Sequence, residues 1–213
     1  EFIINPDIIP MGIHLNGATL WDTKTIGKIE KGRHYSHQGN LIAIHAEQDI
    51  KLSEYAEYIK KAIQVTLDIP AIHFSYLWDC IFAIEKVLAH DVEHFLNCKG
   101  GEVHQSVIYD GIENVFIHEN SKICAGVILD ASNGPIIIDE NVQIDIGALI
   151  QGPIYIGKNS VINPGAKLRG NIAIGPTCKV GGEVEDVVIQ GFSNKQHDGF
   201  LGHSYIGEWV NLG

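Results

Sequence analysis

The polar segment between Asn194 and Phe200 contains residue types that proton transfer and anion binding require. At its centre, His197 carries an imidazole, whose ordinary pKa of about 6.5 lets it accept a proton from a nucleophile near neutral pH. Lys195 could bind an anionic substrate group such as a phosphate, and so could the amide of Asn194. Arg169 offers a planar guanidinium for the same task. These residues predict a general base close to anion-binding side chains.

A second candidate for chemistry is the H-x-x-E-H pattern that runs from His90 to His94. In zinc peptidases such a pattern supplies two metal ligands and a general base. Here it lies at the end of a predicted helix that places both histidines on one face, and no third ligand is evident in the sequence. We therefore expect a surface helix and no metal site, with a zinc hydrolase as the alternative.

Composition limits the partners of this chain of 213 residues. Lys and Arg total 15 and Asp and Glu total 26, which gives a formal net charge of −11. This argues against nucleic acids and anionic membranes as partners, because binding their phosphates requires a basic surface. No apolar run reaches the ~18–20 residues of a membrane span, and the first residues lack the basic region and cleavage site of a signal peptide. We expect a cytoplasmic protein.

The four cysteines are widely spaced, and none of them forms a C-x-x-C pair. In a cytoplasmic protein this spacing favours reduced, mostly buried thiols over disulfides, metal ligands or a redox centre. The residues concerned are Cys80, Cys98, Cys124 and Cys178.

Glycine divides the chain into two halves. Residues 1–101 contain seven of the 23 glycines and residues 102–213 contain the other sixteen, so we place a linker at Gly100 and Gly101. In the first half, the apolar pattern predicts strands at 2–4 and 40–44, a helix at 53–62 capped by Ser53, and a second helix at 76–95. This half has no Gly-rich phosphate loop, and it is predicted to be part of an α/β domain.

The second half repeats with a period of six residues. Aliphatic residues occupy eight consecutive positions at this spacing, namely Ile138, Ile144, Ile150, Ile156, Ile162, Leu168, Ile174 and Val180. Three earlier residues keep the spacing but lie three residues out of phase, and two later ones resume it: Ile117, Ile123 and Leu129, then Ile206 and Leu212. Such a period fits one short strand and one corner, three of which close a turn of about 18 residues. Residues 102–213 are therefore predicted to form a parallel β-helix with an aliphatic interior.

The repeat is interrupted between residues 186 and 204, where polar residues concentrate. Loops that interrupt a rigid solenoid often carry function, so we predict a functional loop here that contains His197. The chain also begins without Met and stops inside the repeat. We therefore expect it to be a fragment of a longer protein.

Residues 117–213 resemble the left-handed β-helix of hexapeptide-repeat transferases. The stretch 194–213 is similar to the active-site stretch of the bifunctional family that acetylates glucosamine 1-phosphate and then uridylylates it. It is closer still to related bacterial sugar-phosphate nucleotidyltransferase-like proteins, which share the run SNKxHDGFLGxSxIGEW. Residues 1–101 resemble the C-terminal part of their nucleotidyltransferase-like domain, through Leu41-Ile42-Ala43 and the helix from Trp78 to Phe95. The left-handed sense of the helix is implied by this resemblance.

The resemblance also implies roles for individual residues. The general base falls on His197, a substrate-contacting asparagine on Asn211, and a phosphate- or sugar-binding arginine on Arg169. Two positions depart from the family pattern: Phe200 stands where a substrate-contacting tyrosine is expected, and Glu185 where a substrate-binding lysine is expected. These departures bear on whether the same amino sugar is acylated.

The partners implied by the resemblance are those of a transferase. They are acetyl-CoA, or another acyl-CoA, as co-substrate, and a sugar phosphate or nucleotide sugar as acceptor. Because the site of such transferases forms between subunits, a homotrimer is also implied. In the intact protein the nucleotidyltransferase domain would use Mg²⁺, and its G-x-G-x-R loop would precede residue 1. The alternative is that the β-helix serves as a non-catalytic trimerisation or regulatory platform.

Overall fold

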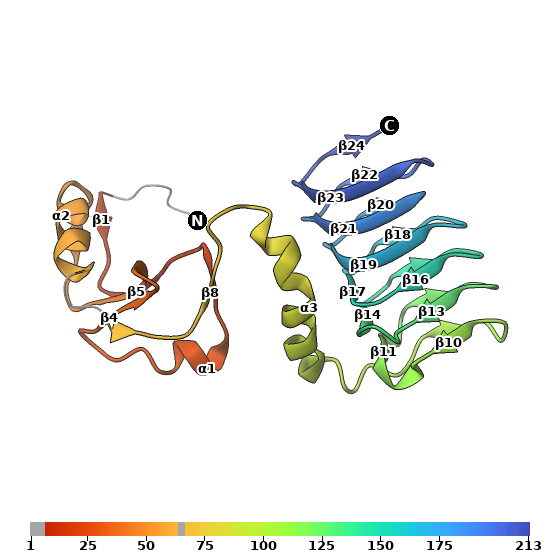
Figure 1. Cartoon of the computed structure of the whole chain (residues 1–213), viewed down its shortest axis with the longest axis horizontal. Coiled ribbons are helices and arrows are strands. Elements are labelled where there is room, and N and C mark those ends of the chain that lie inside the picture. Colours follow the sequence, from red (N-terminus) through yellow and green to blue (C-terminus); the bar gives the residue numbers. More distant parts are fainter. Residues whose placement is uncertain (1–6, 64–66) are drawn as a thin grey trace. The chain divides into compact units, whose positions relative to one another are not determined.

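The computed structural model describes residues 7–63 and 67–213 (Figure 1). The chain divides into two compact units, and the division falls between Ser75 and Tyr76. The strand predicted at residues 2–4 lies outside the described residues. Of the helices in the described part of the chain, none is long and apolar enough to cross a membrane.

The first unit mixes short strands with helices. Its described elements are β1 (Ile8–Ile9), β2 (Gly12–Leu15), β3 (Thr19–Leu20), α1 (Thr23–Ile26), β4 (His34–His37), β5 (Asn40–Ala46), β6 (Ile50–Lys51), α2 (Leu52–Ile63), β7 (Leu67–Asp68) and β8 (Ile72–His73). Strands β2, β5, β4 and β7 lie side by side in that order, and Tyr35, Ile42 and Ala43 are buried in a common cluster. The predicted strand at 40–44 is confirmed as part of β5. The predicted helix at 53–62 is confirmed as α2, which begins at Leu52 and so includes Ser53 rather than following it.

The second unit contains a parallel β-helix with three faces, about six turns long over residues 102–212. The first face contains β10 (Ile108–Asp110), β13 (Ile128–Asp130), β16 (Leu149–Gln151) and the first halves of β19 (Lys167–Ile174), β21 (Glu183–Ile189) and β23 (Phe200–Ile206). The second face contains β11 (Val115–Ile117), β14 (Ile136–Ile138), β17 (Ile154–Ile156) and the second halves of β19, β21 and β23. The third face contains β9 (Glu102–Val103), β12 (Lys122–Ile123), β15 (Gln143–Ile144), β18 (Val161–Ile162), β20 (Lys179–Val180), β22 (Asn194–Lys195) and β24 (Asn211–Leu212). The predicted parallel β-helix is confirmed.

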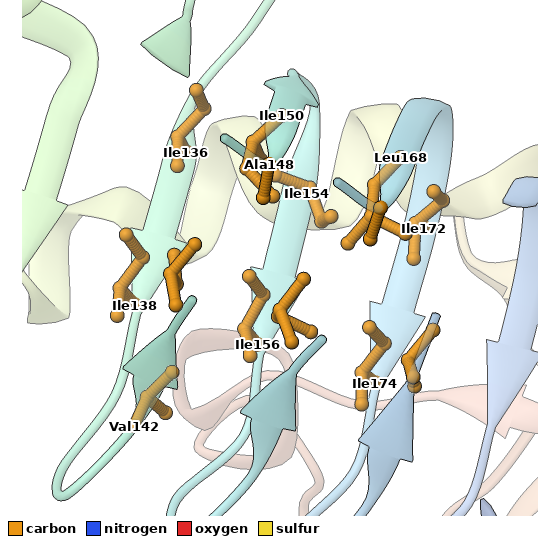
Figure 2. Packing of buried hydrophobic residues seen from close by; sticks show 14 of the residues in the cluster. Ile136, Ile138, Val142, Ala148, Ile150, Ile154, Ile156, Leu168, Ile172 and Ile174 are labelled. Carbon is orange, nitrogen blue, oxygen red and sulfur yellow. The ribbon is translucent and has the colours of Figure 1, made fainter. Parts of the chain in front are cut away.

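The aliphatic residues that recur every six positions point into this β-helix. All eight of them, from Ile138 to Val180, are at most 1 % exposed. Figure 2 shows Ile138, Ile156 and Ile174 in line on the neighbouring strands β14, β17 and β19. Each inward side chain packs on those of the coils above and below, so burial of apolar surface at about 25 cal/mol per Å² is the main stabilising term.

The length of each coil explains where the six-residue register changes. Gln143 pairs with Val161, 18 residues later, as three hexads require. Lys122 pairs with Gln143, 21 residues later, because a turn at residues 132–134 adds three residues to this coil. This insertion accounts for the earlier aliphatic block being three residues out of phase.

The interruption predicted at 186–204 is a tightening of the β-helix and not a loop that leaves it. The segment remains in the coil as the second part of β21, then β22, then most of β23. Lys179 pairs with Asn194, 15 residues later, and Asn194 pairs with Asn211, 17 residues later. These shorter coils break the six-residue register without breaking the stack of strands. The prediction of a functional loop at 186–204 was therefore wrong about its structure.

Helix α3 (Asp79–Asp91) covers the outside of the second face, and Figure 1 shows it running along the stacked strands. Ile81, Ile84 and Leu88 pack against Phe116 and Ile137, which point outward from β11 and β14. Both of these strands are apolar at every position, as expected for strands buried on both sides. The predicted helix at 76–95 is confirmed as α3 followed by a 3-10 turn at Val92–His94, and it belongs to the unit that contains the β-helix.

Tyr155, on the outside of β17, is half-buried beneath this helix, and its hydroxyl donates a hydrogen bond to Asp139 Oδ2 at 2.7 Å. Burial raises the pKa of the Tyr155 hydroxyl well above its ordinary value, and the Asp139 carboxylate raises it further. The folded protein therefore keeps this proton at pH values at which an unfolded tyrosine, with a pKa of about 10, loses it. Unfolding then releases a proton, so stability falls as the pH rises above about 10.

We expect Tyr155→Phe to remove part of this alkaline loss. At pH 8 the variant should be less stable by about 1–2 kcal/mol, because Asp139 loses a hydrogen bond. Between about pH 9 and 11 its free energy of unfolding should fall less steeply than that of the wild type. Urea unfolding across this range measures both effects, and equal slopes for the two proteins would contradict the assignment.

Candidate functional site

His197 lies at a corner of the β-helix, between β22 on the third face and β23 on the first. Its side chain is exposed, and among the residues that the structure describes it has no hydrogen-bond or ion-pair partner. The backbone of this corner is held from inside the coil. The imidazole is therefore open to a substrate while the main chain that carries it is fixed.

Lys195 provides that inner support. It pairs with Val180 and Leu212 on the third face, and it occupies the inward position that Val180 fills in the coil before it. Only 8 % of Lys195 is exposed, and its ammonium donates a hydrogen bond to the carbonyl oxygen of His197. The predicted contact of Lys195 with a substrate phosphate does not fit this enclosed position. The side chain anchors the corner that carries His197 instead.

Arg169 lies on the outside of the first face. It follows directly after the residues of β19 that pair with β16. Its guanidinium forms ion pairs with the carboxylates of Glu183 and Glu185, and Glu185 is its register partner on β21. A phosphate would therefore have to compete with two carboxylates for this side chain. Glu185 stands where the family pattern has a lysine. It is thus one of the two acidic partners of Arg169.

We expect Arg169→Gln to change stability only slightly. The three side chains are 35–41 % exposed, and exposed ion pairs contribute about 0–1 kcal/mol because solvent screens them. The variant should lose less than about 1 kcal/mol of unfolding free energy, and the difference should shrink in about 1 M salt. Urea unfolding at two salt concentrations measures this, and a loss that persists at high salt would contradict the expectation.

Asn194 and Asn211 lie next to each other on the outside of the third face. They are register partners on β22 and β24, and they point outward because the residues that follow them, Lys195 and Leu212, occupy the inward positions. Asn194 is half-buried and Asn211 is exposed. The structure therefore brings these two predicted substrate contacts together. Asn194 lies on the strand that leads into the corner of His197, and Asn211 lies beside it on the next coil, whereas Arg169 lies on another face.

An exposed aromatic pair that the sequence did not predict lies beside these asparagines. The rings of Phe192 and Trp209 are stacked, with centroids 4.8 Å apart and an interplanar angle of 10°. The two residues are separated by 17 positions, which is the length of the coil from Asn194 to Asn211. A search for aromatic residues one coil apart could have found them, but only after the shortened coil length was known.

The H-x-x-E-H pattern does not lie on one helix. Helix α3 ends at Asp91, and His94 follows in the 3-10 turn. In the described part of the chain, no group of three or more His, Cys, Asp or Glu side chains could hold a metal ion. Within this pattern, His90 Nδ1 contacts Asp91 Oδ1 at 3.2 Å.

The four cysteines are free thiols, with Cys178 buried and the other three half-buried. Burial raises the pKa of every one of these thiols: Cys80, Cys98, Cys124 and Cys178. A raised pKa keeps them as thiols at neutral pH, and the thiolate is the nucleophilic form. They are poor candidates for a nucleophile.

Comparison with known families gives one match. Residues 135–170 match the family described as bacterial transferase hexapeptide (six repeats). These residues form strands β14 to β18 and much of β19, in the middle of the stack. The match and the observed coil together fit a left-handed β-helix and suggest a transferase in general terms. A search of curated proteins found no match to the chain.

Proposed function

We propose that the β-helix is an acyltransferase domain. It would transfer the acyl group of acetyl-CoA, or of another acyl-CoA, to a sugar phosphate, an amino-sugar phosphate or a nucleotide sugar. The observation that carries this proposal is the exposed imidazole of His197, at a corner whose backbone is held by Lys195 and whose neighbouring strand presents Asn194. The hexapeptide-transferase match over 135–170 supports the same class of reaction.

In this proposal His197 acts as a general base. Its imidazole takes the proton of an acceptor amine or hydroxyl as that group attacks the thioester carbonyl. The new bond forms between the acceptor atom and the acyl carbon, and the carbon–sulfur bond then breaks. The CoA thiolate leaves and recovers a proton from the imidazolium. The acyl group has thus moved from CoA to the acceptor, the proton has moved from the acceptor to the CoA thiol, and His197 is regenerated.

The acceptor is held by the polar groups that remain open to solvent. Asn194 and Asn211 can bind hydroxyl groups of a sugar, because both amides face outward. Phe200 is 60 % exposed at the start of β23 and adds an apolar surface where the family pattern has a tyrosine. Because Arg169 is paired with two carboxylates and Lys195 is enclosed, we assign neither of them a direct contact with phosphate.

The proposal extends to the intact protein. Residues 1–101 would be the C-terminal part of a nucleotidyltransferase-like domain that uses Mg²⁺, and the β-helix would assemble as a homotrimer. We also propose a cytoplasmic location, because acyl-CoA and sugar phosphates would be available there.

The test is an acyl-transfer assay with the protein as it stands. Purified protein is incubated with radiolabelled acetyl-CoA and a panel of amino-sugar phosphates and nucleotide sugars, and labelled sugar is separated from CoA. We expect labelled product from at least one acceptor at a rate well above that without protein. No labelled product from any acceptor, together with no detectable binding of acetyl-CoA, would contradict acyl transfer.

A second candidate function is a trimerisation or regulatory platform. It is favoured by a ladder of outward aliphatic residues on the first face, where Ile108, Ile128 and Leu149 are register partners on β10, β13 and β16. These side chains are 59 %, 36 % and 36 % exposed, which is unusual for three aliphatic neighbours in a row. A trimer mass by light scattering without any acyl-CoA binding would favour this function over catalysis.

A further inference from the structure

The first coil of the β-helix is less enclosed than the coils that follow it. Its inward residues Val115 and Ile117 are 6 % and 5 % exposed, whereas the eight aliphatic residues of the repeat from Ile138 to Val180 are at most 1 % exposed. In the described part of the chain, β9 and β10 pair only with strands of the next coil. Figure 1 shows β10 and β11 at the opposite end of the stack from β24. The interior of the β-helix is therefore open at its first coil.

A pocket of about 320 Å³ lies at this opening, and we call it the base pocket. Its apolar lining consists of Val103, Tyr109, Ile112, Val115 and Ile117. All of these except Ile112 belong to or pack against the buried interior of the β-helix. Ile112 begins the 3-10 turn Ile112–Asn114 between β10 and β11, and it is 61 % exposed. Pockets that bind small molecules are mostly apolar and measure about 300–1,000 Å³, so the base pocket has the size and lining for a small ligand.

Two side chains of opposite charge, Lys99 and Glu113, also line the base pocket. Both are exposed, and among the residues that the structure describes neither of them forms an ion pair with the other or with a third residue. The backbone of Lys99 is fixed beside the pocket, because this residue bridges to Ile117 on β11. A ligand that carries a negative and a positive group could therefore pair with both side chains at once.

Tyr109 adds a hydrogen-bond donor to the aliphatic wall. It is the inward residue of β10, and the equivalent positions of the next two coils are Leu129 and Ile150, which are completely buried. Its hydroxyl forms no hydrogen bond within the described part of the chain, and it can donate one to a carboxylate.

We propose that the base pocket binds a free aliphatic amino acid, such as leucine, in its zwitterionic form. The carboxylate of the ligand pairs with Lys99 and accepts a hydrogen bond from Tyr109, and its ammonium group pairs with Glu113. The aliphatic side chain of the ligand covers the apolar lining, which removes that surface from water. This site is independent of the proposed acyl transfer, because His197 lies at the other end of the stack.

Four ligands separate the three contacts when they are titrated into the full chain and followed by saturation-transfer NMR. Leucine carries both charges and the side chain, leucinamide lacks the carboxylate, N-acetyl-leucine lacks the ammonium group, and glycine lacks the side chain. Leucine should bind, and each of the two derivatives should bind roughly tenfold more weakly, because each loses one charge-assisted contact. Glycine should show no binding at the same concentrations.

Charge variants of the protein should match these losses one by one. Glu113→Gln should weaken binding of leucine and leucinamide by roughly tenfold and leave that of N-acetyl-leucine unchanged. Lys99→Gln should weaken binding of leucine and N-acetyl-leucine and leave that of leucinamide unchanged. Both positions are exposed, so folding is not at risk. The matched control is Glu208→Gln, which changes the net charge equally at an exposed position after β23 and should bind all four ligands like the wild type.

Ile112→Ser tests the apolar contact and should weaken binding of leucine and of both derivatives alike. Its control is Ile146→Ser, because Ile146 is 63 % exposed and does not line the base pocket. The inference is overturned if the wild type binds no leucine at concentrations up to about 10 mM. It is also overturned if Glu113→Gln and Lys99→Gln both bind leucine like the wild type, or if Ile146→Ser weakens binding as much as Ile112→Ser does.

Discussion

Replacing His197 with alanine is expected to lower the rate of acyl transfer by about 10²–10⁴-fold, the contribution of a positioned general base. The imidazole is exposed and contributes no packing, so the melting temperature and the far-UV circular dichroism spectrum should not change. The measurement is the rate of CoA release with a saturating acceptor in the acyl-transfer assay. The loss should appear in kcat, because the proton is transferred only in the chemical step.

The matched control for this variant is His203→Ala. His203 is also exposed at a coil corner, between the first and second faces, where its ring contacts Asp186 Oδ2 at 3.3 Å. Because it lies at a different corner from His197, its removal should leave the rate within a few fold of the wild type. Equal losses in the two variants, or no loss in His197→Ala, would show that His197 is not the base.

Replacing Ile144 with alanine is expected to lower the free energy of unfolding by about 2–5 kcal/mol. Ile144 is completely buried in the inward column of the third face, where it pairs with Ile123 on one side and Ile162 on the other. The coil has no way to collapse around the missing atoms, because its radius is fixed by the backbone hydrogen bonds of the neighbouring coils. Urea unfolding followed by circular dichroism measures the loss.

Gln143→Ala is the matched control, because it changes an outward-facing residue on the same strand. Gln143 precedes Ile144, points outward and is exposed. Its side-chain amide donates a hydrogen bond to the carboxylate of Asp145 on the surface. Removing it should change the free energy of unfolding by no more than about 0.5 kcal/mol. Comparable losses in the two variants would contradict the assignment of inward and outward positions.

The aliphatic repeat predicted the interior of the β-helix because each hexad places one residue in the same environment. Ile138 to Val180 stack as expected, since every coil in that range has three equal sides. The repeat could not predict the coils on either side, because their lengths depend on corner geometry. The three residues inserted near Gly134 and the shortened coil after Val180 both shift the register.

Because of the same change in coil length, the buried position of Lys195 could not be predicted from the sequence. Read in the six-residue register, this lysine appears to be in a polar loop, but in the structure it is the inward residue of β22. The packing of α3 against the second face could not be predicted either, because the contacts of Ile81 and Ile84 with Ile137 join residues more than fifty positions apart. His197, Asn194 and Asn211 were predicted as site residues from their chemistry and from the resemblance to a family. The stacking of Phe192 and Trp209 could not be predicted in that way, because it depends on the length of the coil between them.

Amide hydrogen exchange tests most directly whether the β-helix continues through the segment that carries His197. The amides of Lys179, Gly181 and Gln190 donate to carbonyl groups of Ser193, Lys195 and Ile206 in the following coil, as that of Gln143 donates to Ser160 earlier in the stack. We expect slow exchange for Lys179, Gly181 and Gln190, within about tenfold of the rate at Gln143. Exchange of these three amides at the rate of an unstructured chain, with Gln143 still protected, would show that the segment leaves the coil and would contradict the site described above.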